Sequence, residues 1–539
     1  MTINKTAIWE RTGVAMLLFS ILFTFFLSFC YPMDGSNDIS LHYLRLAADN
    51  DFTTNTMVAG TTFFYNLCSE FFGHNYWIWQ KLSWLINALT VLVPYVFLLN
   101  ARQRRRYAFV AALAMLVMQQ RFGCEPYRLV FLFMTIMMTS FIKYVDTKKF
   151  EWVFFVAVML PLIAYTRFPS IFVWPLMIIA FIVLNYNKLY TYFVALAPLL
   201  LLVWLGLLCN GTIDGYFDAI LSDIDGVGAM GHTVGSVFWA GVASMLETLL
   251  YALLIAFPCV MCVAWKVKEV DVFKTLAMAG AGVVTLLVIV YPSEHILAAL
   301  VWCAAALHCY DKHFARKNVA VAMTVVLAPL FCCAGSYDGF IYDYFSVCYL
   351  PYLAVHTQSL DIRRHKEKHH HHSDVYRYVK RRLYRRPLMG FIAVFTFATL
   401  LSRFIAFGKT YMECGELYMV NANSLGANLN RNYVGEETYD RLDALSKEYI
   451  MLTRQYDEVV FWGPDASTMS LLYDKWPVTY MCNTSSADAD SKAFSEFKDY
   501  IKEKRPVVID QERHANTATF LLAIGYKKTS KEGHDVFVP

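Results

Sequence analysis

Long runs of apolar residues recur along most of the chain, and this feature constrains the fold more than any other. A helix needs about 20 mostly apolar residues to cross the hydrocarbon layer of a bilayer. The sequence contains about thirteen such segments, so it predicts an α-helical polytopic membrane protein. The candidate spans are residues 12–30, 78–99, 107–120, 127–142, 152–166, 170–186, 191–209, 236–265, 274–291, 294–310, 318–334, 340–356 and 387–407.

The composition supports this interpretation. Hydrophobic residues make up 57% of the chain and charged residues only 17%, whereas soluble domains carry about 25% charged residues. The first apolar run follows Lys5 and Arg11 and is not followed by a small-residue cleavage site. We therefore predict an uncleaved first span rather than a secretory signal peptide.

The distribution of Lys and Arg predicts the orientation of the spans. Basic residues gather in cytoplasmic loops of membrane proteins. In this chain they gather in every second connection, whereas residues 31–77 hold only Arg45 and residues 210–235 hold none. The N-terminus is therefore predicted inside and, with an odd number of spans, the C-terminus outside. The basic positions that carry this argument are Arg102, Arg104, Arg105, Arg106, Lys143, Lys148, Lys149, Lys266, Lys268, Lys312, Arg316, Lys317 and the basic loop 357–386.

The chain divides into a membrane domain, residues 1–407, and a polar C-terminal domain, residues 408–539. Buried-strand patterns occur at 459–462, 506–509 and 536–538, and helical patterns lie near 436–454, 487–503 and 514–524. Alternating strands and helices predict a small extracytoplasmic α/β domain. It has no glycine-rich phosphate loop, so no nucleotide site is predicted.

The cysteine pairs and the histidine run of this chain favour structural roles over metal binding. Cys259 and Cys262 have no matching second pair, which argues against a zinc site. Cys414 and Cys482 of the C-terminal domain can form a disulfide if they lie close together. His365 and the run 369–372 lie among Lys and Arg, which favours a solvated basic loop near lipid headgroups over a metal site.

The first outer loop, residues 31–77, is too long for a simple connection. Apolar residues near 39–47 and 58–72 fit two amphipathic helices on the membrane surface. Asp34 and Asp38 stand just after the first span, where a carboxylate can act as a base toward a hydroxyl. The alternative is that either Asp only caps the first surface helix.

Charged residues also stand at other outer boundaries. Arg121, Glu125 and Arg128 flank the turn before the fourth span, and Arg167 ends the fifth. A guanidinium suits a phosphate because it donates two parallel hydrogen bonds. Local ion pairing and interfacial snorkelling are the alternatives. The acidic triplet 223–225 is a weak indication of function, because acidic loops are common on protein surfaces. Glu294-His295 lies in another short outer loop and is either a second polar contact or the start of a helix.

The first 170 residues resemble the GT-C superfamily of membrane glycosyltransferases, in particular the protein mannosyltransferase and lipid A aminoarabinose transferase branch. Those enzymes place an Asp just after the first span, followed by two surface helices, and the loop ends with a sequence motif like Leu-Phe-Gly. Asp34 follows Pro32-Met33 here, and Phe71-Phe72-Gly73 closes the loop before Gln80-Lys81. Two later features also resemble that branch, namely Arg167-Phe168-Pro169 and the phrase Trp462-Gly463-Pro464 in the C-terminal domain.

The resemblance implies a GT-C-like fold and a sugar donor carried on a polyprenyl phosphate. Asp34, or Asp38 as the second choice, would take the proton from the acceptor hydroxyl, and transfer would invert the anomeric carbon. The leaving phosphate would be held by an arginine, and the acceptor or a metal would be positioned by acidic residues and an imidazole. The arginines are Arg121, Arg128 and Arg167, and the positioning candidates are Glu125, Glu294 and His295.

The same resemblance implies the partners and the location. Some relatives use a divalent metal ion and others do not, so no cofactor is assigned beyond that possibility. The expected partners are membrane lipids, the lipid-linked sugar and a glycan, lipid or protein acceptor, with no nucleic acid. The C-terminal domain would guide the acceptor in the periplasm of a bacterial inner membrane.

Two other classes of function remain open from the sequence. One is a transporter or flippase of lipid-linked saccharides, and the other is a non-catalytic membrane assembly protein. Transporters often show repeated halves and charges near the bilayer midplane. This chain shows no internal repeat, and its charges cluster at the outer boundary, which favours chemistry at the outer face.

Overall fold

The computed structural model describes most helices of the N-terminal region and most of the C-terminal domain. The described residues are 5–30, 59–72, 76–97, 108, 111–112, 115–116, 126–210, 220–221, 234–268, 295–311, 315–332, 419–421, 424–426, 433–463, 466–473, 492–511, 513, 515–531 and 534–539. The statements that follow concern these residues.

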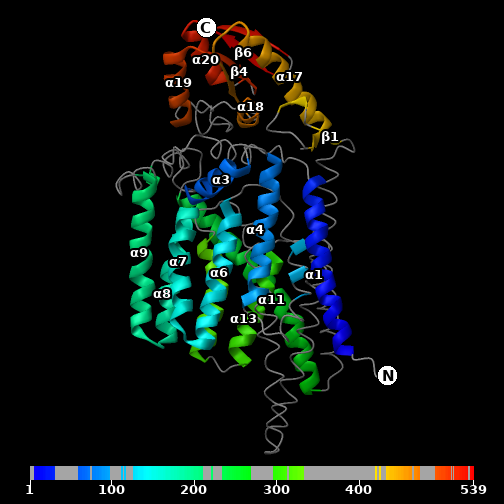
Figure 1. Cartoon of the computed structure of the whole chain (residues 1–539), viewed down its shortest axis with the longest axis vertical. Helices are drawn as coiled ribbons and strands as arrows, with labels where there is room; N and C mark the ends of the chain where they lie inside the picture. The colour runs from blue at the N-terminus through cyan, green and yellow to red at the C-terminus, as the bar shows by residue number, and fades with distance from the viewer. Residues whose placement is uncertain are drawn as a thin grey trace, which may run out of the picture.

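A bundle of helices carries the C-terminal domain at one end, which we call the domain end, and the N-terminus lies at the other (Figure 1). A short helix, α3, lies at the domain end beneath the C-terminal domain. The helices are α1 (Lys5–Cys30), α3 (Ala59–Phe72), α4 (Tyr76–Phe97), α6 (Pro126–Thr147), α7 (Phe150–Thr166), the 3₁₀ helix η3 (Phe168–Phe172), α8 (Val173–Leu184), α9 (Lys188–Asn210), α11 (Val234–Lys268), α13 (His295–Asp311) and α14 (Arg316–Cys332).

Two stretches of the described helices are long and apolar enough to cross a membrane, Arg128–Thr147 in α6 and Lys188–Leu207 in α9. Buried helices of soluble proteins also meet this criterion, and the α6 stretch is 72% buried. The α9 stretch is only 22% buried, so its apolar side chains face outward, as do Leu200 and Trp204. A largely exposed apolar helix is unusual for a protein that lies wholly in water.

The C-terminal domain is built on a mixed four-stranded sheet. Its strands are β3 (Val459–Trp462), β4 (Val507–Asp510), β5 (Lys527–Ser530) and β6 (Asp535–Val538), in the spatial order β3-β4-β6-β5. Strands β3 and β4 run parallel, and β6 is antiparallel to both β4 and β5. A separate antiparallel pair is formed by β1 (Met419–Asn421) and β2 (Tyr433–Gly435).

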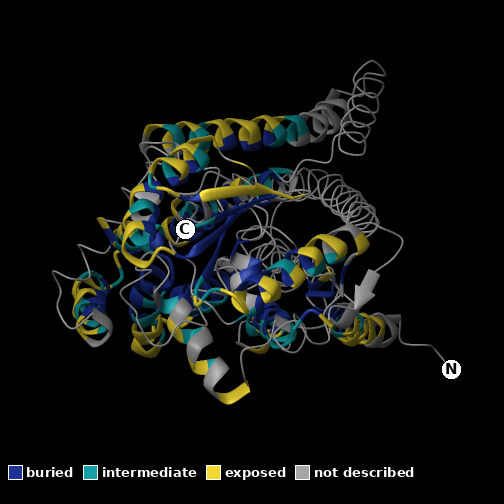
Figure 2. Cartoon of the chain, turned by 90° about the horizontal axis from the view of Figure 1, so that it is seen from above, coloured by how far each residue is buried: buried dark blue, intermediate teal, exposed yellow. Residues whose placement is uncertain are grey.

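Helices cover both faces of this sheet. Successive strand residues point to opposite faces. Phe461 stacks on Tyr449 of α17 (Glu436–Thr453), and its neighbour Trp462 packs on Phe497 of α19 (Lys492–Lys504), with ring centroids 5.1 and 4.2 Å apart. Phe520 of α20 (Ala515–Ala523) lies beside α19. Figure 2 shows the inner strands as buried and one edge strand as exposed, which matches the exposed residues of β5.

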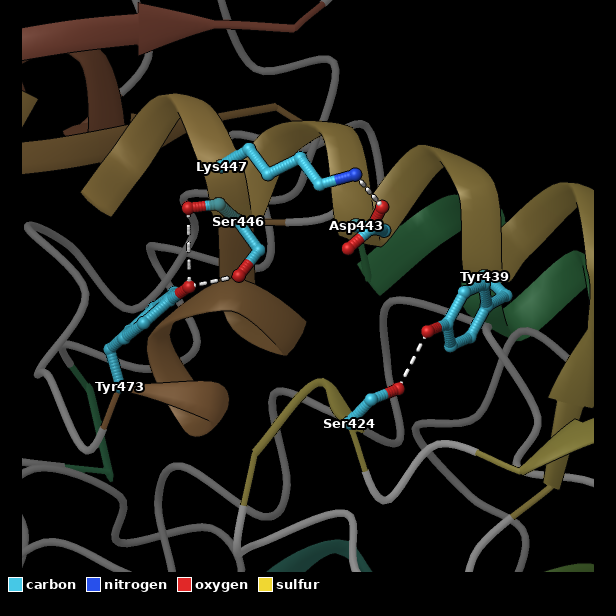
Figure 3. A network of polar contacts seen from close by, with 6 residues as sticks. All are labelled: Ser424, Tyr439, Asp443, Ser446, Lys447 and Tyr473. Carbon is cyan, nitrogen blue, oxygen red and sulfur yellow. Dashed lines mark hydrogen bonds and ion pairs between the residues drawn. The ribbon is translucent and has the colours of Figure 1, made fainter. Parts of the chain in front are cut away.

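Polar contacts hold the irregular segments of the domain against α17 (Figure 3). The hydroxyls of Ser446 and Tyr473 are hydrogen-bonded, which ties α17 to the end of α18 (Ala466–Leu472). Ser424 and Tyr439 are joined in the same way, with their oxygens 2.6 Å apart. The exposed Asp443–Lys447 pair lies between these two contacts and adds little, because water screens it.

The sequence patterns predict most described helices of the bundle to within a few residues, and the strands β3, β4 and β6 are also confirmed. The differences are that α1 begins seven residues before the predicted 12–30, α6 ends five residues after the predicted 127–142, and residues 170–186 are divided between η3 and α8. The sequence analysis missed β5, because its residues Lys527–Ser530 are polar and exposed at the sheet edge. The predicted spans 274–291, 340–356 and 387–407 lie outside the described residues, as do Cys414, Cys482, the run 369–372 and the acidic triplet 223–225.

A buried carboxylate joins the two hairpin strands to the loop before α20. The side chain of Asp535 is 1% exposed, and its oxygens lie 2.6 Å from Lys528 Nζ and 3.7 Å from Arg513 Nε. Burial alone raises the pKa of Asp535. Hydrogen bonds from Lys528 and Ser530 and the charges of Lys528 and Arg513 outweigh burial and lower this pKa below its ordinary value.

We predict that Asp535→Asn lowers the stability of the domain by about 2 kcal/mol at neutral pH, because it leaves Lys528 without its carboxylate. A lowered pKa stabilises the fold above the unfolded value of about 3.9 and loses this effect as the pH falls through the folded value. The difference between wild type and variant should therefore shrink in acid. Hydrogen exchange of the β6 amides in the full-length protein measures this stability difference. As a control, Lys502→Met breaks the exposed pair with Asp499 and should change the exchange rates little.

Candidate functional site

Two buried arginines mark the domain end of the bundle. Helices α6 and α7 run in opposite directions from their connection at 148–149, so Arg128 and Arg167 lie at the same end, roughly 25–30 Å from that connection. Arg128 is 0% exposed and Arg167 is 5% exposed. Arginine is rarely buried this deeply, because removing its charge from water is costly unless polar or anionic groups surround it.

Arg167 stands where α7 ends and the chain turns into η3. Pro169 has no backbone N–H and favours the start of a new helical turn over the continuation of α7. Arg167 adopts an extended conformation, with φ −150° and ψ 106°, and its N–H donates to Ile163 O at 3.0 Å. Its guanidinium lies near Ser170, with Nη1 3.5 Å from the hydroxyl oxygen.

Helix α3 packs directly against this corner. The hydroxyl of Thr61 donates to the backbone carbonyl of Thr166 at 3.1 Å. Gly60 makes the close approach possible, since a Cβ there would lie 2.8 Å from the Tyr165 ring and 2.9 Å from Thr166 N. The helix predicted near 58–72 is therefore present as α3 and is held beside Arg167, whereas its position on a membrane surface stays a prediction.

Arg128 faces a row of buried polar side chains on α4. Its Nη1 donates to Asn87 Oδ1 at 3.2 Å. Gln80, Ser83, Asn87 and Thr90 are all buried and share one side of α4 because their spacing follows the helical repeat. The Ser83 hydroxyl has no hydrogen-bond partner among the described residues. The α4–α6 contact is therefore polar at the domain end, between helices that are otherwise apolar.

The C-terminal end of α1 is attached to the same helix. Lys81 Nζ donates to the backbone carbonyl of Ser28, and Trp84 Nε1 donates to the Thr24 hydroxyl at 3.1 Å. A cation at a helix C-terminus is favourable because the last carbonyls are negative. The residues that follow α1 therefore begin next to the polar side of α4.

The C-terminal domain is seated on these helices. Its hydrophobic core is continuous with buried Trp79 and Ile86 of α4 and Leu129 of α6, with Phe64 of α3 packed against them. The domain therefore covers the part of the bundle that carries Arg128. The contact is apolar, so separating the two parts would expose these side chains to water.

His295 begins α13, as the predicted helix start requires, and contacts α11. Its Nδ1 lies 2.9 Å from the Thr248 hydroxyl, and its Nε2 lies 3.4 Å from a carboxylate oxygen of Glu247. Among the described residues, no three His, Cys, Asp or Glu side chains gather into a group that could hold a metal ion.

Asp34, Asp38, Arg121, Glu125 and Glu294 lie outside the described residues. The structure brings Arg128 and Arg167 to the same end of the bundle. Arg128 is hydrogen-bonded to Asn87 of α4, Arg167 to Ser170 of η3, and His295 to Thr248 of α11.

The chemistry available at the domain end is the binding of anions. Guanidinium groups bind phosphate through two parallel charge-assisted hydrogen bonds, and such bonds are stronger where water is excluded. Neutral hydroxyl and amide groups on α4 add donors without adding negative charge.

No family model matches the sequence. A search of curated proteins also finds no match.

Sequence reasoning missed the groups that support the arginines. Gly60 and Thr61 lie in the small-residue run 59–62, which is unusual for a surface helix and was the available signal. Asn87, the partner of Arg128, gave a different signal, because it is a polar residue in the middle of an apolar segment.

We predict that Gly60→Ala loosens α3 from α7, because the added Cβ has no space against Tyr165 and the Thr166 backbone. Amide exchange in α3 should accelerate by about 10-fold, the effect of roughly 1.4 kcal/mol. Gly241→Ala on α11 is the matched control, because no atom lies within 4 Å of its Cβ position. Equal exchange in the two variants would contradict the close packing.

Proposed function

We propose that this protein is an integral membrane glycosyltransferase of the GT-C type. It transfers a sugar from a polyprenyl-phosphate donor to an acceptor at the extracytoplasmic face, with inversion. The protein has about thirteen spans, with the N-terminus inside and the C-terminal domain outside. In this proposal the domain end of the bundle is extracytoplasmic, and the membrane is the bacterial inner membrane.

The observation that carries the proposal is the Arg167 corner together with α3. A buried guanidinium lies at the end of an apolar hairpin whose length, roughly 25–30 Å, is close to the hydrocarbon thickness. A lipid phosphate sits at this depth, because its chain lies in the hydrocarbon and its charge at the boundary. Helix α3 closes the corner from the outer side through Thr61 and Gly60.

The exposed side chains of α3 fit the same position. Phe71 and Phe72 are 76% and 60% exposed, and Leu67 is 42% exposed, on a helix that packs against the bundle on its other side. Exposed aromatic and aliphatic groups on a short helix at the end of an apolar bundle are typical of a helix lying in the membrane interface. A lipid-linked donor can enter such a site sideways from the bilayer.

In the proposed mechanism, Asp34 removes the proton from the acceptor hydroxyl, and Asp38 is the second candidate for this role. The acceptor oxygen forms the new bond to the anomeric carbon as the bond to the lipid phosphate breaks, which inverts that carbon. Arg167 stabilises the negative charge on the leaving phosphate, with Arg128 and Arg121 as further candidates. Glu125, Glu294 and His295 position the acceptor.

Binding of the leaving lipid tests the arginine assignment without knowledge of the sugar. We predict that Arg167→Met weakens binding of undecaprenyl phosphate by about 10–100-fold, because it removes charge-assisted hydrogen bonds of roughly 1.5–3 kcal/mol. Arg167→Lys should recover only part of this affinity, since an ammonium cannot bind a phosphate with two parallel donors. Native mass spectrometry of the full-length protein measures the bound fraction.

Two controls separate phosphate binding from general lipid binding. Undecaprenol lacks the phosphate, so its retention should be the same in wild type and Arg167→Met. Arg316→Met removes a cation at the start of α14 and should leave undecaprenyl phosphate binding unchanged. Equal binding of undecaprenyl phosphate to wild type and Arg167→Met would exclude the proposed role of Arg167.

A second measurement separates the enzyme from a lipid transporter. Asp34→Asn should keep undecaprenyl phosphate binding but lose covalent sugar transfer in reconstituted vesicles, and loss in Asp38→Asn instead would assign the role to Asp38. Unchanged transfer in both variants would contradict the catalytic assignment. Movement of a lipid-linked sugar across the membrane without covalent transfer would support a transporter instead.

A further inference from the structure

The end of the bundle opposite the C-terminal domain, which we call the far end, carries the connection between α6 and α7 (Figure 1). Tyr144 of α6 meets Tyr186 from the α8–α9 connection and Tyr190 of α9 there, with ring centroids 6.1 and 5.9 Å apart. Segments far apart in the sequence therefore place polar side chains together. The tyrosine–lysine cluster, as we call it, comprises Lys143, Tyr144, Asp146, Lys148, Tyr186, Tyr190 and Lys317.

Lys148 has an unusual backbone conformation within this cluster. Its φ is 60°, in the left-handed region that is unfavourable for a residue with a Cβ and is usually taken by glycine where a helix ends. Its N–H donates to the Tyr144 carbonyl at 2.7 Å, which closes the last turn of α6. Its Nζ lies over the Tyr186 ring, 4.7 Å from the ring centroid. The chain therefore keeps a cation on the aromatic side chains at a position where glycine would fit the backbone better.

The donors of the cluster have unused hydrogen-bonding capacity. In the described part of the chain, the ammonium groups of Lys143, Lys148 and Lys317 form no hydrogen bond and no close ion pair. Tyr144 is only 1% exposed, and its hydroxyl has no hydrogen-bond partner among the described residues either. This hydroxyl is not sealed from the surroundings, so a bound group can reach it. Polar groups of a nearly buried side chain normally have a partner, which indicates that a group from outside completes the cluster.

The balance of charge in the cluster favours an anion. Three ammonium groups stand against one carboxylate, that of Asp146, whose charge interacts first with Lys317 and then with Lys143. Lys148 is therefore the cation that this carboxylate compensates least. The neighbouring Lys149 lies 3.6 Å from Glu151, and this pair adds no net charge.

Apolar side chains are exposed beside the cluster, which points to a lipid rather than a free anion. Phe150 packs against Tyr190, with ring centroids 5.5 Å apart, and is itself 44% exposed. Leu189 and Tyr192 of α9 are 69% and 62% exposed. Cations and phenol hydroxyls next to exposed apolar groups are typical of the boundary between hydrocarbon and headgroups, where basic sites between helices bind anionic lipids.

We propose that the tyrosine–lysine cluster binds the headgroup of an anionic phospholipid from the cytoplasmic leaflet. The ammonium groups neutralise the lipid phosphate, the Tyr144 hydroxyl donates a hydrogen bond to it, and the acyl chains lie along the exposed groups of α7 and α9. The site lies roughly 25–30 Å from Arg167, so it is separate from the site proposed for the sugar donor. It rests on the membrane placement given under the proposed function, but not on glycosyl transfer.

Native mass spectrometry of the full-length protein in detergent tests this site. The probe is phosphatidylglycerol, and phosphatidylethanolamine with the same acyl chains is the lipid without net charge. Phosphatidylglycerol should be retained more strongly. Excess inorganic phosphate should not displace it, because only the lipid also contacts the apolar groups beside the cluster. Complete displacement by phosphate would assign the cluster to a soluble anion and overturn the proposal.

Three variants and a matched control give the test its specificity. Lys148→Met should weaken phosphatidylglycerol binding by about 5-fold, the effect of one basic residue at an anionic membrane surface. Tyr144→Phe removes only a hydroxyl and should weaken binding by about 2–10-fold. Asp146→Asn removes the opposing charge and should strengthen binding by about 2–5-fold. Lys498→Met is the control, because Lys498 also lies over an aromatic ring, that of Phe494, but in the C-terminal domain.

A glycine variant distinguishes a lost lipid from a lost fold. Lys148→Gly removes the ammonium group but suits the left-handed backbone, so the unfolding temperature of the lipid-free protein should stay the same or rise. Its phosphatidylglycerol binding should nevertheless fall as far as that of Lys148→Met. Equal retention of phosphatidylglycerol by the wild type and both Lys148 variants would overturn the proposal, and so would equal binding of the two phospholipids by the wild type.

One further comparison keeps this proposal separate from the proposed function. Arg167→Met should leave phosphatidylglycerol binding unchanged, because Arg167 lies at the domain end of the bundle. A loss of phosphatidylglycerol in Arg167→Met equal to that in Lys148→Met would contradict a separate site at the far end. Undecaprenyl phosphate binding that does not depend on Arg167 would instead count against the proposed function alone.

Discussion

The cost of burying a guanidinium in an apolar bundle is the constraint on which the rest of the site depends. A charge removed from water is tolerated only where polar groups surround it. The polar row on α4, the break after α7 and the close docking of α3 all lie around Arg128 or Arg167. Each of these features lowers helix stability or packing freedom locally. Their concentration at one end of the bundle is the physical reason to look for function there.

Much of the fold follows from the sequence, because hydrophobic periodicity reports burial directly. The helices of the bundle and the inner strands of the sheet are apolar along their length, and both were predicted close to their observed bounds. The strand β5 was missed for the opposite reason. Its residues are exposed at the edge of the sheet, so its pairing with β6 leaves no apolar pattern in the chain.

The site was less predictable, because its geometry depends on residues far apart in the chain. The charges of Arg128 and Arg167 were evident as ionisable groups at span boundaries. Their supporting groups were not, since a glycine such as Gly60 shows its role only when the neighbouring helix is in place. The partner of His295 was likewise hidden, because Glu247 lies 48 positions earlier and comes from another helix.

The continuity between the C-terminal core and helices α4 and α6 of the bundle has a practical consequence for dissecting the protein. Cutting the chain near residue 408 would leave Trp79, Ile86 and Leu129 without their cover and expose these apolar side chains to water. The truncated bundle and the released domain would each expose an apolar surface that is complementary to the other. Fragments made by such a cut should aggregate or reassociate, so the two halves need to be studied as one piece or cut with a redesigned contact.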